Sequence, residues 1–148
     1  ERVSSVQIVG DAFARPLLAE LARSSPPDLS SLRFLVSGGA ILSAPVKEAL
    51  VEAVPGLRII DVLGSSETGR QAVATRRADA EPTTVVGEAG SQFSPERTAV
   101  VLSEDRGRVL APGDPELGWL AQGGRVPLGY LGDPDKTRAT FPTVDGVR

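Results

Sequence analysis

The sequence has 148 residues, of which 41% are hydrophobic, and 16 Lys+Arg stand against 19 Asp+Glu for a net charge of −3. This length and composition suit a globular domain with its own core and exclude a disordered chain. The acidic balance argues against a nucleic-acid or anionic-membrane binder, which needs clustered positive charge. The chain has no cysteine and no histidine, which excludes disulfides, thiolate chemistry and a histidine base from its own residues.

The first half of the chain alternates apolar runs with helical patterns. Three short apolar or β-branched runs that end at glycine or polar residues predict strands at 6–9, 33–37 and 57–62. Between the first two, a helix is predicted from the helical spacing of Leu17, Leu18 and Leu21. Pro16 is expected in the first turn of this helix, the only place where it is tolerated.

A second helix is predicted between the second and third strands. Ser43 is its N-cap candidate, Pro45 lies just inside it, and Pro55-Gly56 stops it. Its apolar stripe comprises Val46, Ala49, Leu50, Ala53 and Val54. Strand, helix and strand with a short return form a βαβ unit, so we expect a parallel sheet with a right-handed crossover.

The second half of the chain has a different texture. Short β-rich runs separated by turn residues lie at 98–102, 108–110 and 118–121. A short helix is predicted after Asp133 as its cap, with Pro134 at its first position. We therefore expect an α/β fold: part of a parallel α/β subdomain at 1–93, followed by an incomplete, small antiparallel β-subdomain at 94–148.

The stretch Leu63–Gly69 carries most of the chemical information. It follows the third predicted strand, so hydroxyls and one carboxylate are expected on a glycine-started loop at a strand end, where open α/β sheets bind ligands. Small side chains let a phosphate approach the backbone, hydroxyls donate to its oxygens, and a carboxylate can hold Mg²⁺. From the residues alone, Gly-Ser-Ser is also an ordinary loop composition, and Glu67 an ordinary solvated carboxylate.

Two further segments complete a pattern. Ser37–Ala40 follows the second predicted strand, and its paired glycines also suit an ordinary tight turn. Gly129–Thr137 comes later and is followed by Phe141 and Asp145-Gly146. In this order, over nearly the whole chain, the segments resemble the adenylate-forming (AMP-binding) enzymes. Within that family the amino-acid sequence resembles those of actinobacterial acyl-CoA synthetases, also called fatty-acid–CoA ligases.

The resemblance implies roles for residues of the first two segments. It assigns the turn that packs its backbone against adenine to Gly38, Gly39 and Ala40. The family's pattern of glycine, small residue, hydroxyl residue and glutamate is matched by Gly64, Ser65, Ser66 and Glu67. It further implies that the Ser66 hydroxyl binds the α-phosphate region and that Glu67 binds Mg²⁺. These two residues are therefore the catalytic candidates.

Two positions need separate treatment. Leu63 stands where most relatives have tyrosine or phenylalanine to stack on adenine, so it keeps an apolar contact but loses about 1 kcal/mol of ring–ring interaction. Either ATP binds more weakly, or another residue covers that face. Asp61 stands where relatives often have a polar residue that reaches the adenine amino group. Its carboxylate would accept from that group or would cap a turn.

The resemblance implies an enzyme that activates a carboxylic acid with ATP and Mg²⁺ and transfers the acyl group to CoA. A medium or long fatty acid is the default substrate, and a steroid-derived acid is the alternative. The family's phosphate loop, ribose-binding aspartate and C-terminal catalytic lysine are not matched, so we expect an internal piece that is inactive alone. The expected partners are small molecules and not nucleic acid, in a cytoplasmic protein without a transmembrane segment. Homo-oligomerisation is left open.

Three other classes share parts of this pattern. A serine hydrolase would need a glycine where Thr68 stands in the nucleophile elbow, and a histidine base. A dinucleotide-binding module would need a G-x-G-x-x-G run after a strand, which the chain lacks. The third class is an adenylate-forming relative that loads an acyl carrier protein, or a non-catalytic homologue. These residues do not separate that class from the acyl-CoA synthetases.

Overall fold

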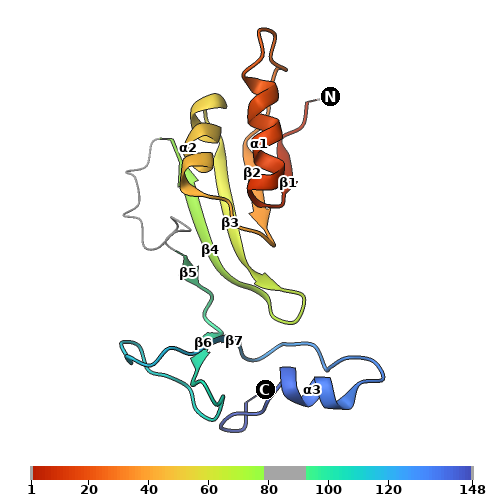
Figure 1. The fold of residues 1–148 in the computed structure, drawn as a ribbon, viewed down its shortest axis with the longest axis vertical. Helices are drawn as coiled ribbons and strands as arrows, with labels where there is room; N and C mark the ends of the chain where they lie inside the picture. The colour runs from red at the N-terminus through yellow and green to blue at the C-terminus, as the bar shows by residue number, and fades with distance from the viewer. Residues whose placement is uncertain (1, 79–92, 148) are drawn as a thin grey trace. The chain divides into compact units, whose positions relative to one another are not determined.

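A computed structural model describes residues 2–78 and 93–147 (Figure 1). The chain divides into two compact units, which are Glu1–Gly64 with Ala72–Ser94, and Ser65–Gln71 with Pro95–Arg148. We call them the first and the second unit. The chain passes between them three times, and the division at 93/94 inferred from the sequence stays a prediction. Among the described residues, no helix is long and apolar enough to cross a membrane.

The first unit is built on a sheet with strand order β1-β2-β3-β4-β5. Its elements are β1 (Ser5–Ile8), α1 (Gly10–Leu21), β2 (Phe34–Gly38), α2 (Ala44–Ala53), β3 (Arg58–Ser65), β4 (Gly69–Arg77) and β5 (Ser94–Pro95). The end of β3, the start of β4 and the end of β5 belong to the second unit. β1, β2 and β3 are parallel neighbours. Because both crossovers step the same way across the sheet, α1 and α2 cover one face and contact each other (Figure 1). The α/β fold is confirmed.

The core of the first unit lies between this sheet face and the two helices. Leu35 of β2 and Ile59 of β3 are fully buried, as is Leu50 of α2. Leu42 and Leu57, from the segments that flank α2, close the same cluster. Burying an aliphatic side chain of this size is worth about 1.5–3 kcal/mol, so this cluster is the main source of the unit's stability.

Helix α2 begins after Ser43 as predicted, but its buried face is shifted around the helix from the predicted stripe. The members of that stripe that are buried are Val46, Leu50 and Val54. Ala53 is exposed, while Val51 and Lys47 are buried. The Ser43 hydroxyl makes no cap hydrogen bond to the helix, because it donates to a carboxylate of α1.

Helix α1 starts earlier than the leucine spacing predicts. Because it begins at Gly10, Pro16 lies in its interior, and the expectation that this proline sits in the first turn is wrong. The proline ring removes the N–H that would bond the carbonyl of Ala12. Pro16 is on the exposed side of the helix, so the apolar contacts that hold α1 on the sheet are unaffected.

The third strand is longer than predicted and continues into a hairpin. Gly64 and Ser65 are the last residues of β3, so they do not open a loop, and only residues 66–68 form the turn. Two parallel strands need a crossover of a dozen or more residues between them, and the turn between β3 and β4 has only three. β4 therefore runs antiparallel to β3, and the sheet is mixed. β4 was not predicted, because its sequence GRQAVATRR is rich in arginine. Its alternate residues Ala72 and Ala74 are nevertheless buried.

The second unit contains a two-stranded antiparallel sheet and one short helix. β6 (Ala99–Leu102) pairs with β7 (Trp119–Gln122), which confirms the small antiparallel sheet. The strand predicted at 108–110 is wrong, because that segment makes only one bridge, between Leu102 and Val109. α3 (Pro134–Thr140) begins as predicted, and the Asp133 carboxylate accepts a hydrogen bond from the Lys136 N–H at 2.9 Å.

Candidate functional site

A pocket of about 280 Å³ lies at the ends of β2 and β3 in the first unit. Five of the residues that the resemblance assigns to a nucleotide line it, namely Gly39, Ala40, Asp61, Leu63 and Gly64. This volume is near the lower limit of about 300 Å³ for small-molecule pockets, so it suits a single ring system better than a whole nucleotide. The structure thus brings together residues of two motifs that are more than twenty positions apart in the sequence.

The paired glycines are explained by backbone geometry. Gly39 has φ of +86°, in the left-handed region that favours glycine. A Cβ on Gly38 would lie 3.3 Å from the carbonyl oxygen of Val62 on the neighbouring strand. The pair therefore permits a sharp turn beside a closely packed strand, and it leaves the pocket wall free of side chains at Gly39.

The first residues of α1 hold the loop that follows this turn. The Gly10 N–H donates to the Ser37 hydroxyl at 3.2 Å, and the Asp11 N–H donates to the Ile41 carbonyl at 3.0 Å. The Asp11 carboxylate accepts from both the N–H and the hydroxyl of Ser43, each at 2.8 Å. A Cβ on Gly10 would lie 2.5 Å from the Ile41 oxygen. The pocket wall is therefore fixed by hydrogen bonds at both of its ends.

Asp61 is a buried member of the pocket wall, and it already has a charged partner. Its Oδ2 lies 2.5 Å from the Nζ of Lys47 on α2, and both side chains are at most 10% exposed. Of the two roles left open by the sequence, neither included this ion pair. A carboxylate has about four lone-pair sites, so an ion pair at one oxygen leaves acceptor capacity at the other. Contact with an adenine amino group stays a prediction.

An aromatic side chain that no sequence motif marks also lines this pocket. Phe93 is partly buried and shares the pocket with Leu63, which is 41% exposed. It is separated from Leu63 by thirty positions and lies in no recognisable motif. Its place in the pocket favours the second of the two outcomes expected for Leu63, in which another residue covers the face that lacks an aromatic ring.

The hydroxyls of the hairpin turn divide into structural and exposed groups. Ser65 accepts from the Glu67 N–H at 3.2 Å and contacts the Thr68 hydroxyl at 3.1 Å. The Ser65 N–H donates to that same hydroxyl, also at 3.1 Å. Ser65 and Thr68 therefore shape the turn, while Ser66 is exposed at its tip. Ser65 and Ser66 are both predicted to contact a nucleotide, and Ser66 is also predicted to be catalytic. Ser66 is the one of the two that does not shape the turn.

Glu67 has a hydrogen-bond partner from a segment far along the chain. The Tyr130 hydroxyl donates to its Oε1 at 2.7 Å. This bond is the main reason that the pKa of Glu67 lies below its ordinary value, with smaller contributions from backbone and Ser65 hydrogen bonds and from the charge of Lys136. The same bond raises the pKa of Tyr130, because ionising the phenol would face a carboxylate. Glu67 is therefore held as an oriented anion at neutral pH.

Tyr130 contacts two further side chains besides Glu67. Its ring lies 5.8 Å from the ring of Phe141, and the ammonium of Lys136 lies 4.1 Å from its centroid. No motif in the sequence pairs positions 67 and 130, so this contact could not be predicted. Tyr130 therefore both contacts Phe141 and Lys136 and donates a hydrogen bond to Glu67, the predicted metal ligand.

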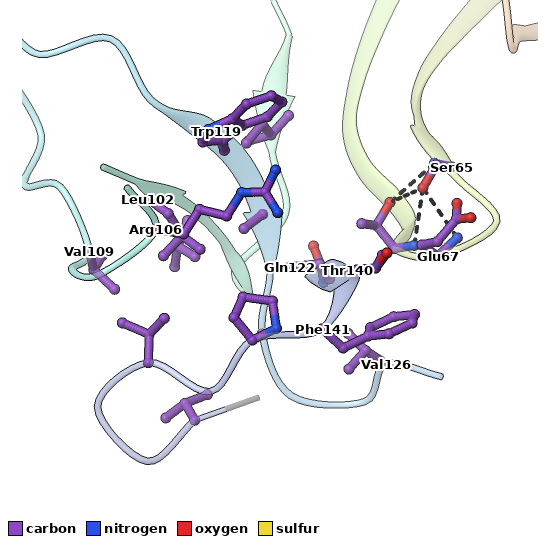
Figure 2. Close-up of a pocket in the computed structure, with 18 of the residues that line it drawn as sticks. Ser65, Glu67, Leu102, Arg106, Val109, Trp119, Gln122, Val126, Thr140 and Phe141 are labelled. Atoms are coloured by element: carbon purple, nitrogen blue, oxygen red, sulfur yellow. Dashed lines mark hydrogen bonds between the residues drawn. The ribbon is translucent and has the colours of Figure 1, made fainter. Parts of the chain in front are cut away.

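A larger hollow of about 560 Å³ lies in the second unit (Figure 2). Figure 2 shows Ser65, at the end of β3, and Glu67, on the hairpin turn, at one side of it, with Trp119 and Phe141 elsewhere along its wall. The Trp119 indole N–H donates to the Glu104 carbonyl at 3.1 Å, and the ring carries the Arg106 guanidinium 4.6 Å from its centroid. Trp119 is 53% exposed, so it makes these contacts at the surface of the unit.

The donor atoms of the turn suit a hard divalent cation that is held mainly by a bound phosphate. Within the described ranges, no group of three or more Asp, Glu, His or Cys gathers as a cage. Mg²⁺ in nucleotide sites typically takes one or two carboxylates together with phosphate oxygens and water. A single ionised carboxylate at Glu67, next to the exposed hydroxyl of Ser66, fits that arrangement.

The chain is similar to proteins of known sequence and structure. The chain is 44% identical to the medium-chain acyl-CoA ligase Mig of Mycobacterium avium, covering 100% of this chain and 26% of that protein. It is 39% identical to a medium/long-chain-fatty-acid–CoA/3-oxocholest-4-en-26-oate–CoA ligase of Mycobacterium marinum, covering 99% and 26%. The crystal structure of VinN superposes with a TM-score of 0.74 at 27% identity, over 95% of this chain and 34% of that one.

The chain spans about a quarter of the length of the curated relatives that it matches. The sequence profile described as AMP-binding enzyme matches residues 1–131, which is most of the chain and includes both lining motifs and Tyr130. The chain therefore belongs to the AMP-binding enzyme family.

Proposed function

We propose that the full-length protein is an ATP-dependent acyl-CoA ligase and that this chain supplies part of its adenylate-binding site. The observation that carries the proposal is the pocket that joins Gly39-Ala40 to Asp61–Gly64, from which the chain continues directly into Ser66-Glu67. Membership of the AMP-binding family and the acyl-CoA ligase names of the two mycobacterial relatives support it.

The reaction would proceed in two transfers. First, a carboxylate oxygen of the acid attacks the α-phosphorus of ATP. The bond from that phosphorus to the bridging oxygen breaks, which yields an acyl-adenylate and pyrophosphate. Then the CoA thiol attacks the acyl carbonyl, AMP leaves, and the thiol proton is released. In both transfers the enzyme's contribution is mainly positioning and electrostatic stabilisation.

This chain's residues would act at the first transfer. The pocket wall at Gly39 and Ala40 would hold the base, with Leu63 and Phe93 as apolar contacts. Negative charge builds on the α-phosphoryl oxygens in the transition state, and the Ser66 hydroxyl would donate to one of them. Glu67 would hold Mg²⁺, which, when bound, supplies charge neutralisation at the phosphates.

For the acid, we propose a medium- to long-chain fatty acid, with a steroid-derived acid as the alternative. Support comes from the activities for which the two relatives are named, at 44% and 39% identity. A series of acids of increasing chain length, and one sterol side-chain acid, would be compared in the full-length protein by AMP formation. If AMP forms fastest with one of the fatty acids, the result supports a fatty acid as the substrate. If it forms fastest with the sterol side-chain acid, the result supports the alternative.

The test of the proposal is binding of a non-hydrolysable ATP analogue to the full-length protein by calorimetry, with and without Mg²⁺. Wild type should bind more tightly with Mg²⁺, and Glu67→Ala should lose that increment while retaining Mg²⁺-independent binding. Acid-dependent adenylation by Glu67→Ala should fall about 10²–10³-fold. Glu52→Ala, which removes an exposed carboxylate from α2, is the matched control and should behave as wild type.

Two results would count against the proposal. If wild type binds no adenine nucleotide, the chain belongs to a non-catalytic member of the family. If acyl-adenylate forms but CoA does not accelerate AMP release, the acceptor is another thiol, such as that of a carrier protein.

A further inference from the structure

Lys47 is a charged residue on a face of α2 that is otherwise apolar. Its residue-level exposure is 4%, and its helical neighbours Val46, Leu50 and Val51 are core residues. The chain has only two lysines, and the other, Lys136, is exposed. A lysine is almost never fully buried without a partner, and here the partner is the Asp61 carboxylate at 2.5 Å.

Stability alone is a weak reason for this ion pair. Taking two charges out of water costs several kcal/mol per ion, and replacing a buried pair by apolar residues of similar volume is often neutral or stabilising. The helix is already anchored by its apolar side chains and by the bidentate contact of Glu48 with Arg76 on β4, at 2.7 and 2.6 Å. A function for the pair is therefore best sought at its other end.

At that other end, Asp61 lines the pocket together with Gly39, Ala40 and Leu63. The ion pair with Lys47 holds one of the two oxygens of this carboxylate. An ionised carboxylate is an acceptor only, so its remaining lone pairs can receive an N–H but repel a carbonyl oxygen. The pocket is sized for one ring system. A fixed hydrogen-bond acceptor in its wall therefore favours a ring with an exocyclic amino group over one with a carbonyl oxygen at that position.

We propose that Lys47 is a positioning residue that fixes Asp61 as an oriented acceptor and thereby gives the pocket its preference for a 6-aminopurine. The inference rests on the proposed function, because it takes the base of ATP as the occupant of the pocket. Lys47 itself touches no substrate in this scheme. It acts through Asp61, across the contact between α2 and β3.

The experiment compares ATP with purine riboside 5′-triphosphate, which lacks only the 6-amino group, in the full-length protein. Binding of the two nucleotides is measured by calorimetry, and KM and kcat are measured separately in the adenylation reaction. Wild type should prefer ATP by about 10- to 100-fold, the value of a hydrogen bond to a charged group. Lys47→Met should bring the preference close to one, mainly through a higher KM for ATP, with little change for the riboside.

Two companion variants keep the test decisive. Lys47→Met with Asp61→Leu removes both charges, so it avoids leaving a buried carboxylate unpaired, and it should fold and show no preference for ATP. Glu48→Gln weakens the exposed ion pair at the adjacent position of α2, and it should retain the preference of wild type.

The outcomes separate the inference from the proposed function. If wild type binds neither nucleotide, the proposed function fails. If wild type binds both equally, or if Lys47→Met lowers affinity for both nucleotides by the same factor, the ion pair is only structural and the inference is overturned. A preference that is lost in Lys47→Met and in the double variant but kept in Glu48→Gln supports it.

Discussion

Each of the two compact units is stabilised internally by a different kind of interaction. In the first, both helices and the parallel strands contribute to one cluster that includes Leu35, Leu50 and Ile59, all fully buried. In the second, among described residues, the buried apolar side chains are Leu102, Leu110 and Val144, while Leu117 and Leu128 are about 90% exposed. Its turns are instead held by side-chain hydrogen bonds and ion pairs, such as Arg108 with Asp114 and Glu116. The predicted metal ligand thus belongs to the less strongly packed unit.

This difference has a physical meaning for the site. Segments with few buried apolar contacts open more readily than a packed core, and ligand-binding loops are drawn from that softer group. The pocket at the ends of β2 and β3 belongs to the more tightly packed unit, whereas Glu67 depends on a hairpin turn and on one tyrosine. We therefore expect mutations to affect the two units in different ways.

The largest effect is expected from opening the core. Leu50→Ala removes a side chain that is 0% exposed and should lower the free energy of opening of α2 and β3 by about 2–5 kcal/mol. Leu117→Ala, at a position that is 91% exposed, should change it by less than about 0.5 kcal/mol. Native-state amide hydrogen exchange on the full-length protein measures both. Equal effects of the two substitutions would contradict the contrast between the units.

A smaller effect is expected at the start of α3, because this helix has no buried residue and is capped by a hydrogen bond from its own backbone to Asp133. Asp133→Ala removes the acceptor for the Lys136 N–H and should destabilise this helix by about 1 kcal/mol. Asp135→Ala, which removes only an exposed ion pair with Arg138, should cost less. Amide exchange within 134–140 reports both variants. If the two substitutions are equivalent, the cap does not stabilise the helix.

The most subtle prediction concerns the pKa of Glu67. Tyr130→Phe removes the hydroxyl that donates to its carboxylate, so this pKa should rise toward its ordinary value, as read by carbon-detected NMR titration. A lowered pKa means that the contact stabilises the fold above about pH 4.3, the ordinary value for glutamate, and that this contribution is lost as the pH falls through the folded value. The variant should show a weaker loss of stability between pH 5 and 3. An unchanged pKa would mean that the tyrosine does not orient Glu67.

The parts that the sequence predicted well are those with local signals. The parallel strands were marked by apolar runs, α2 by Ser43 and Pro45, and α3 by Asp133-Pro134. Short-range chemistry of this kind is readable without knowing the fold.

The misses all depend on tertiary contacts. The strand β4 is arginine-rich, and it forms because β3 offers an unpaired edge after a three-residue turn. Lys47 looks like an ordinary polar residue on a helix until Asp61 is placed beside it. Phe93 and Tyr130 reach their sites from segments thirty and sixty-three positions away from Leu63 and Glu67, respectively.

The threefold passage of the chain between the units has a consequence for recombination. A chimera that takes residues 1–93 from one homologue and 94–148 from another would separate the hairpin residues 65–71 from the segment with which they are grouped. Glu67 and Tyr130 would then come from different parents. Exchanges that respect the units need two further crossovers, one on each side of the hairpin. We therefore expect hybrids of two homologues to fold best when residues 65–71 and 95–148 come from the same parent, so a short hairpin limits which hybrids can be made.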